Sequence, residues 1–313
     1  MSRNQRIRIR EAENKSSLPD RLRNMRLMGF YHGNLYLGAE STGVISDTFI
    51  FGYSIPDNFI TGMVRLERGA WPSSWTQKDN LLFVGTRFGI ITAVDMDDCD
   101  EVGRLNNMGN SIDAIAVNGA VYFGVNGKGL FKSDTGLTSP SCIGKGHVVS
   151  ALALDKDRLF AFYFSNGNDP FLDEGPAGGL VEVLDSNLSV QSERDGTPYA
   201  VTQAVTTEQG LRFSTRNTTN ASIPFGTGEL YSLNQSDLSD EFLLEFPAAV
   251  NVLRELRQGI LLAGLRDGQV YEVKGNERRL INSQEHGVAG LASEDDIIYI
   301  GSPVGEISKV GDW

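Results

Sequence analysis

The sequence predicts an all-β protein, a seven-bladed β-propeller of four-stranded antiparallel blades. Three observations predict it: one β-hairpin pattern recurs along the 313 residues, the 35 glycines are spread at turn positions, and no segment keeps apolar residues at helical spacing between helix caps. Repeats of this kind are typical of architectures in which each unit buries its apolar faces against its neighbours.

The repeated hairpin consists of an apolar run, a glycine, a short turn with a second glycine, and a second strand-like run. The apolar runs are rich in β-branched and aromatic residues, so we expect strands, with the glycines forming the tight turns between them. Two further copies with longer turns begin at Leu159 and Leu211. The five clear copies are LYLGAESTGVIS (Gly38, Gly43), LFVGTRFGIITAVD (Gly85, Gly89), VYFGVNGKGLFKSD (Gly124, Gly129), LLAGLRDGQVYEV (Gly264, Gly268) and IYIGSPVGEISKV (Gly301, Gly305).

Each hairpin is flanked by further strand candidates. Four strands in about 45 residues is the period of a propeller blade, and seven such units fill the chain. The segments that precede hairpins are DAIAV, ALALD, VNVLREL and AGLAS, and those that follow them are DEVGRL, SVQSER, EFLLEF and ERRLI.

The last unit has three strands, which would leave an exposed sheet edge. The N-terminal RIRIRE alternates with period two through Ile7 and Ile9, as a strand does. We therefore expect residues 1–20 to form an arm whose strand fills the vacant outer position and closes the ring, with the arginines at 6, 8 and 10 facing solvent. Residues 1–313 would form a single propeller domain.

The formal net charge is −12, although residues 1–30 hold seven Arg and one Lys against three acids, a local charge of +5. An acidic body argues against nucleic-acid and anionic-membrane partners, because phosphate contacts need clustered Lys and Arg. No apolar window reaches the length of a membrane span, and no secretory signal is indicated. The two cysteines, Cys99 and Cys142, suit a reducing compartment, so we expect a cytoplasmic protein.

The repeats resemble degenerate WD40-type propeller repeats, with quinoprotein-like repeats as the second resemblance. The matching residues are Gly146 and His147, the Asp-Gly turn at 267–268, and Val94 with Asp95 where the family has Trp-Asp. No Trp-Asp dipeptide occurs in the chain, and Gly-His occurs once. The resemblance covers nearly the whole chain and implies the propeller fold rather than a particular function.

Two turns joining the second and third strands of a unit are longer than the rest: residues 165–179 and 216–229. They belong to neighbouring units, so both should stand on one face, where they would be either functional loops or tolerated insertions. Apolar residues in polar loops must be buried locally or offered to a partner. The partner-binding candidates in these loops are Asn168, Phe171, Leu172, Asn217, Ile223 and Phe225.

RGAWPSSW, residues 68–75, lies in the connection entering the second unit. Trp71 is a further partner-binding candidate, since Trp and Arg are favoured at interface hot spots. The alternative is that at least one of Trp71 and Trp75 packs between blades, because large aromatic side chains dominate cores.

Two histidines, His147 and His286, occupy equivalent places before the inner strands of the fourth and seventh units, while His32 falls in a predicted turn and is expected to be structural. The first two could form a metal or general-base site at the channel mouth, or each could hold its own blade together. VDMDDCDE, residues 94–101, lacks the glycine of a calcium loop and is expected to be a solvated turn. GVNGKG, residues 124–129, joins two strands and lacks the helix of a phosphate cradle.

These patterns favour a non-catalytic protein-interaction platform or assembly subunit that binds through its top-face loops. The alternative is a channel-mouth lyase or hydrolase that acts on a small polar substrate through His147 and His286. The sequence shows no recognisable catalytic constellation, which favours the platform. We expect no cofactor and no bound metal.

Overall fold

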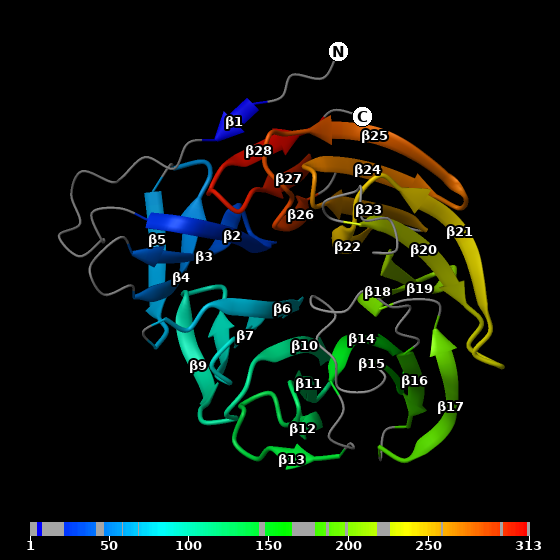
Figure 1. Ribbon diagram of the computed structural model, residues 1–313. Coiled ribbons are helices and arrows are strands. Elements are labelled where there is room, and N and C mark those ends of the chain that lie inside the picture. The colour runs from blue at the N-terminus through cyan, green and yellow to red at the C-terminus, as the bar shows by residue number, and fades with distance from the viewer. Residues whose placement is uncertain are drawn as a thin grey trace.

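A computed structural model describes residues 5–7, 22–41, 47–57, 59–67, 69–143, 148–164, 179–185, 188–197, 200–217, 226–257, 259–294 and 297–311. Throughout these ranges the chain forms strands and turns, and they contain no helix. The strands build seven four-stranded antiparallel sheets arranged as the blades of a propeller (Figure 1). The all-β, seven-bladed expectation is confirmed.

The first four blades follow the chain without interruption. Blade 1 contains β2 (Leu22–Tyr31), β3 (Asn34–Ser41), β4 (Thr48–Ser54) and β5 (Phe59–Arg65), and blade 2 contains β6 (Pro72–Lys78), β7 (Leu81–Thr86), β8 (Ile91–Asp95) and β9 (Asp100–Leu105). Blade 3 contains β10 (Ile112–Val117), β11 (Val121–Val125), β12 (Gly129–Ser133) and β13 (Ser141–Cys142), and blade 4 contains β14 (Val149–Asp155), β15 (Arg158–Phe164), β16 (Gly179–Leu184) and β17 (Val190–Thr197).

The last three blades complete the ring. Blade 5 contains β18 (Ala200–Thr207), β19 (Gly210–Asn217), β20 (Thr227–Leu233) and β21 (Asp240–Phe246), and blade 6 contains β22 (Val250–Arg257), β23 (Ile260–Leu265), β24 (Gln269–Lys274) and β25 (Glu277–Ser283). Blade 7 contains β26 (Gly290–Glu294), β27 (Ile297–Gly301), β28 (Ile307–Val310) and β1 (Gln5–Ile7).

The four strands of each blade are called a to d from the channel outward. Strands a of neighbouring blades contact one another around the channel, and strands d form the rim (Figure 1). Because the strands are antiparallel, the b–c turns and d–a connections lie on one face, called the top face here. The a–b and c–d turns lie on the opposite, bottom face.

The ring is closed by the N-terminal strand. β1 pairs antiparallel with β28 in the register Gln5 with Lys309, Arg6 with Ser308 and Ile7 with Ile307, so it supplies strand d of blade 7. This closure was expected from the alternation in RIRIRE. The solvent-facing orientation expected for the arginines at 6, 8 and 10 concerns side chains outside the described part of the structure.

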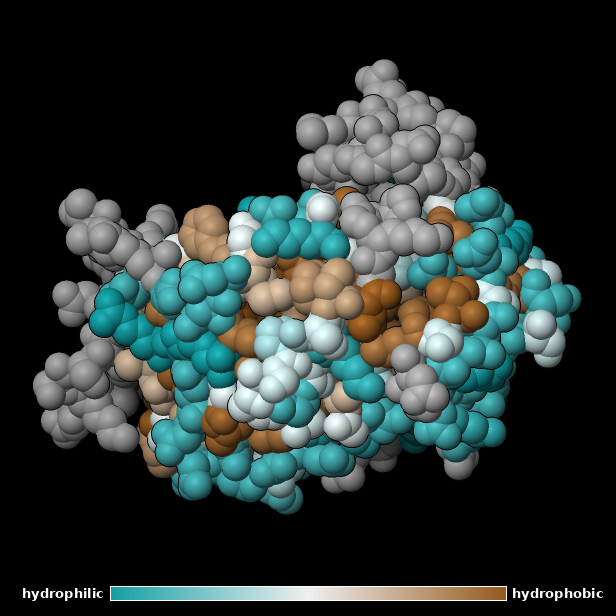
Figure 2. Space-filling view, turned by 90° about the horizontal axis from the view of Figure 1, so that it is seen from below, coloured by the Kyte–Doolittle hydropathy of each residue, from teal (hydrophilic) through white to brown (hydrophobic). Residues whose placement is uncertain are grey.

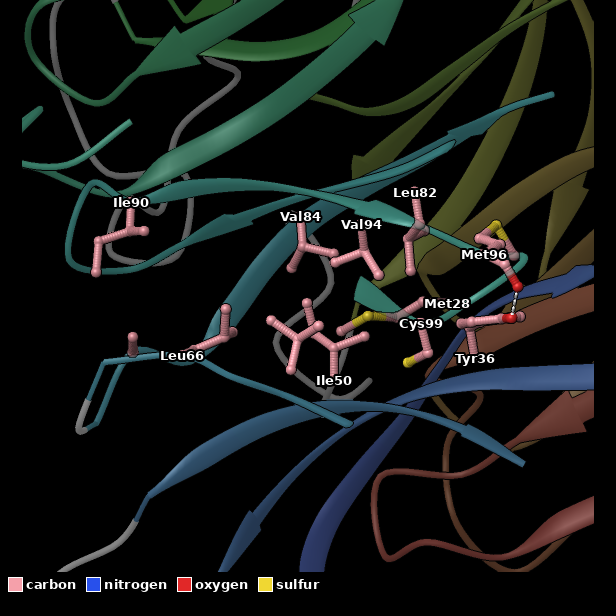
Figure 3. Close-up of a cluster of buried hydrophobic side chains, with 12 residues drawn as sticks. Met28, Tyr36, Ile50, Leu66, Leu82, Val84, Ile90, Val94, Met96 and Cys99 are labelled. Carbon is pink, nitrogen blue, oxygen red and sulfur yellow. Dashed lines mark hydrogen bonds between the residues drawn. The ribbon is translucent and has the colours of Figure 1, made fainter. Parts of the chain in front are cut away.

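The core is divided among the seven interfaces between blades. Each interface contains one cluster of buried apolar side chains drawn from the two blades that it joins. Between blades 1 and 2, Met28 and Ile50 pack against Val84 and Val94, and the Tyr36 hydroxyl donates to the carbonyl of Met96 (Figure 3). Burial of both faces of every sheet is what ties seven short repeats into one ring.

The first glycine of each hairpin does not form a turn, which corrects the sequence expectation. Gly85, Gly124 and Gly264 lie inside strands b, where an added Cβ would stand 2.5–2.6 Å from side-chain atoms of the next blade. The second glycine does form the turn, as at Gly89 and Gly268, whose φ angles of 73° and 92° disfavour other residues. At the first glycine of each hairpin, the absence of a side chain therefore allows neighbouring blades to approach each other closely.

A polar residue near the start of several strands a links one blade to the next. Here the pairing with strand b shifts by one residue, which is a β-bulge. Thr202 Oγ1 lies 3.3 Å from the carbonyl of Val250, and Asn251 Nδ2 lies 3.1 Å from the carbonyl of Val288. Ser73 bonds blade 2 to blade 3 in the same way. These bonds satisfy carbonyls near the top end of the channel.

The rim is not uniformly hydrophilic. Strand d of blade 3, β13, has two residues, whereas β17 in the next blade has eight. Figure 2 views the ring from this side, and hydrophobic residues come to the surface near its middle while hydrophilic residues line its lower edge. Short edge strands limit unwanted pairing with other chains.

Candidate functional site

The top face at the boundary of blades 1 and 2 brings an aromatic side chain and two arginines together. Trp71 immediately precedes β6, and its carbonyl accepts the backbone N–H of Arg87, 2.9 Å away in the b–c turn of blade 2. The Arg26 guanidinium, from strand a of blade 1, lies over the Trp71 ring, 6.0 Å from the ring centroid. This is the outer limit of a cation–π contact.

Burial lowers the pKa of Arg26, and the positive charge of Arg87 lowers it further. Both arginines lack an ion pair with any carboxylate in the described ranges. Glu67, in the same d–a connection, is exposed. Two neighbouring cations without a counter-charge repel each other, and a bound anion would reduce this repulsion.

Phe88 extends this surface. It occupies the b–c turn of blade 2 and is 60% exposed, the largest exposure among the large hydrophobic side chains described. Its ring stands beside Gly69, where an added Cβ would lie 3.1 Å from Phe88 Cε2, so the ring covers the loop that leads to Trp71. We call Arg26, Trp71, Arg87 and Phe88 the Trp71 patch.

Trp75 has a different role. It is partly buried and packs against the cluster between blades 1 and 2. The expectation that at least one of Trp71 and Trp75 packs between blades is therefore confirmed by Trp75. Trp71 is half-buried at the top face, and its partner-binding role stays a prediction.

A second pair of arginines lies on the top face at the boundary of blades 5 and 6. Arg216 is the second-to-last residue of β19, and Arg266 lies in the b–c turn of blade 6, where its Nε donates to Asn251 Oδ1 at 2.9 Å. Burial lowers the pKa of both arginines, and the charge of Arg216 lowers that of Arg266 further. Asn217, a predicted partner-binding residue, donates to Glu229 Oε1 at 3.1 Å.

The two long loops contain most of the predicted binding residues. The described strand ends that they connect, in β15 and β16 and in β19 and β20, lie on the top face of neighbouring blades, as expected. The predicted residues Asn168, Phe171, Leu172, Ile223 and Phe225 lie outside the described residues, so their role stays a prediction.

Of the three histidines, two are described. His286 is half-buried before β26, and His32 forms the a–b turn of blade 1 with a φ of 47°. His147 lies outside the described residues, so its proposed pairing with His286 stays a prediction. In the described ranges, no group of three or more His, Cys, Asp or Glu side chains could hold a metal ion.

The acidic stretch at 94–101 forms the c–d turn of blade 2, as expected. Asp95 accepts the backbone N–H of Asp97 at 2.8 Å, and Asn80 donates to both carboxylates. GVNGKG forms the b–c turn between β11 and β12, also as expected. Throughout the described residues, no helix has the length and hydropathy needed to cross a membrane.

Sequence reasoning missed three members of the Trp71 patch. Arg26 was counted with the basic N-terminus, and Arg87 and Phe88 were not singled out within the hairpin of the second unit. The available signal was the composition of the turn itself, since turns of this length favour Gly, Asn and Asp, and an Arg-Phe pair has no conformational reason to be there.

The blades, their closure and their inter-blade core define the class: a seven-bladed β-propeller, which confirms the WD40-like resemblance at the level of fold. No family model matches the chain, and no curated protein matches its sequence. Solved structures do match. A chain of a mitotic checkpoint complex is 10% identical with a TM-score of 0.66, and the match covers 98% of this chain and 97% of that chain.

Two further structures are similar to this chain. The β-propeller domain of Cps50 (Swd1) from Myceliophteria thermophila is 10% identical, with a TM-score of 0.66 over 93% of this chain and 96% of that domain. Raptor from Chaetomium thermophilum is 15% identical, with a TM-score of 0.64 over 93% of this chain and 28% of that protein. At these identities the likeness shows the fold alone.

Proposed function

We propose that this protein is a non-catalytic interaction platform or assembly subunit that binds a protein partner through its top face. The observation that carries the proposal is the Trp71 patch, where Trp, Phe and Arg side chains meet on one surface. These residue types are enriched at protein interfaces and depleted from ordinary solvent-facing turns.

Two further observations support this function. The loops at 165–179 and 216–229 join strands b and c, as the turn with Arg87 and Phe88 does, so the strand ends that they connect lie on the same face as the Trp71 patch. One structural neighbour comes from a mitotic checkpoint complex, so a ring of this shape serves as a subunit of a protein assembly there. A chain with two cysteines suits a reducing compartment, which supports a cytoplasmic location.

The test is affinity purification from the native source. One bait is the intact protein, and the other has residues 166–178 and 217–227 each shortened to a tight turn. A control bait carries Asp98→Ala and Asp157→Ala, which change exposed bottom-face turns in blades 2 and 4. Circular dichroism and thermal denaturation establish that all three are folded.

We expect a specific protein to co-purify with the intact and control baits and to be lost from the loop variant. Loss from all baits would contradict the platform, and equal capture by all three would contradict binding through the long loops. In that case the alternative enzymatic function is tested by substrate screening with His147→Ala and His286→Ala.

A further inference from the structure

The Trp71 patch has the composition of a surface for a negatively charged segment. The positive charge of Arg87 adds to burial in lowering the pKa of Arg26, and no carboxylate in the described ranges forms an ion pair with either arginine. Five other described arginines form ion pairs with carboxylates, as Arg65 does with Asp47 and Arg104 does with Glu101. The unpaired cations therefore stand out within an acidic protein.

The two aromatic side chains restrict what the anion can belong to. Phe88 is 60% exposed and Trp71 is half-buried beside it, so a ligand must cover apolar surface as well as neutralise charge. A free phosphate or a single carboxylate ion would leave the Phe88 ring in water. A peptide that carries an apolar side chain between acidic ones satisfies both requirements.

The bottom face shows that the positive charge of the Trp71 patch is local and not a general property of the surface. The described a–b and c–d turns on the bottom face carry nine carboxylates against one lysine, Lys156. An acidic segment is repelled there and attracted to the patch, which fixes the orientation of approach. The net charge of −12 also disfavours a long polyanion such as a nucleic acid, whose charge extends beyond the patch. The nine carboxylates belong to Asp57, Asp79, Asp97, Asp98, Asp134, Asp157, Asp185, Glu208 and Asp237.

We propose that the Trp71 patch binds an acidic linear segment of a protein partner, whose carboxylates pair with Arg26 and Arg87 and whose apolar side chain packs on Phe88 and Trp71. The inference rests on the proposed function, because it names the chemistry of the partner at the top face. Arg87 supplies the exposed half of the site, and Arg26, which lies over the Trp71 ring, supplies the partly buried half.

The experiment measures binding of the full chain to arrayed, fluorescein-labelled dodecapeptides. Each peptide carries two to four Asp or Glu residues around one Leu, Ile or Phe, and each has a partner peptide with Asn or Gln in place of the acids. Peptides selected on the array are titrated by fluorescence anisotropy. The variants are Arg87→Glu and Phe88→Ser, which alter exposed side chains and leave the core intact.

Lys78→Glu is the matched control, because it makes the same charge change at the exposed bottom end of β6 in the same blade. We expect acidic peptides to bind more tightly than their amide partners by about tenfold, a difference of about 1.4 kcal/mol. Arg87→Glu should remove this preference, Phe88→Ser should weaken binding severalfold, and Lys78→Glu should leave it unchanged. Raising the salt concentration should weaken binding to the wild-type protein.

Two results overturn the inference. Either no acidic peptide is preferred over its amide partner, or preferred peptides bind Arg87→Glu as tightly as the wild-type protein. If the partner found by affinity purification is still captured by Arg87→Glu, the platform stands and the acidic-segment inference fails. The two proposals therefore fail separately.

Discussion

Replacing Gly124 by Ala tests how closely blades 3 and 4 approach each other. A Cβ at this position would lie 2.5 Å from the Cβ of Val149, against 3.4–4 Å for an ordinary contact, so a blade must move by about 0.9 Å. Overpacking of this kind costs about 1–3 kcal/mol of unfolding free energy. With about 2.1 cal/mol/K of unfolding entropy per residue over 313 residues, the melting temperature should fall by about 1.5–5 °C.

Gly136→Ala in the same blade is the control. Its added Cβ would meet nothing closer than 3.6 Å, and its φ is not in the left-handed region, so the change should stay within about 0.5 kcal/mol. Both variants are compared with the wild-type protein by guanidinium and thermal denaturation, followed by circular dichroism. If Gly124→Ala is as stable as Gly136→Ala, the close approach does not limit packing and the role assigned to the first glycine of each repeat is refuted.

Four further results are expected. Deleting residues 1–10 should uncover the edge of β28, lower the melting temperature and cause concentration-dependent self-association in analytical ultracentrifugation, and an unchanged sedimentation profile would argue against closure by β1. Thr202→Val should lose the bond to the carbonyl of Val250 and about 0.5–1.5 kcal/mol of unfolding free energy, and an equally stable variant would show that this bond contributes nothing. Exposed Cys142 should react with a thiol reagent at pH 8 in the folded protein. Cys99, which is 2% exposed, should react only after the protein is unfolded. Burial raises the pKa of Cys99 from 9.0 to about 11, so its stabilising contribution is present below pH 9 and is lost as the pH rises to 11, and the fall in denaturation midpoint over that range should be smaller in Cys99→Ala.

The repeat was readable from sequence because its signals are local. Strand alternation and turn glycines are set by neighbouring residues, so DEVGRL predicted the strand Asp100–Leu105 and VNVLREL predicted most of Val250–Arg257. The closure by β1 was predictable because the last unit lacked its outer strand and the N-terminal strand belonged to no unit. In a closed ring, these two must pair.

What the sequence could not show depends on contacts between blades. A glycine required by a positive φ and a glycine required by a neighbouring side chain look the same in sequence, so Gly85 and Gly124 were assigned to turns. The Trp71 patch was missed for a similar reason, since Arg26 and Arg87 are separated by a whole blade along the chain. They meet at the top face, where strand a of blade 1 begins and where the b–c turn of blade 2 lies.

Closure by β1 also determines the order in which the molecule can be completed during synthesis. Blades 1 to 6 each use consecutive strands and can pair as soon as their own residues emerge from the ribosome. Blade 7 must wait for residues 307–310, which then have to capture a partner strand made some 300 residues earlier. Until that moment the first residues of the chain stay unpaired, and the nascent protein is an open arc rather than a ring.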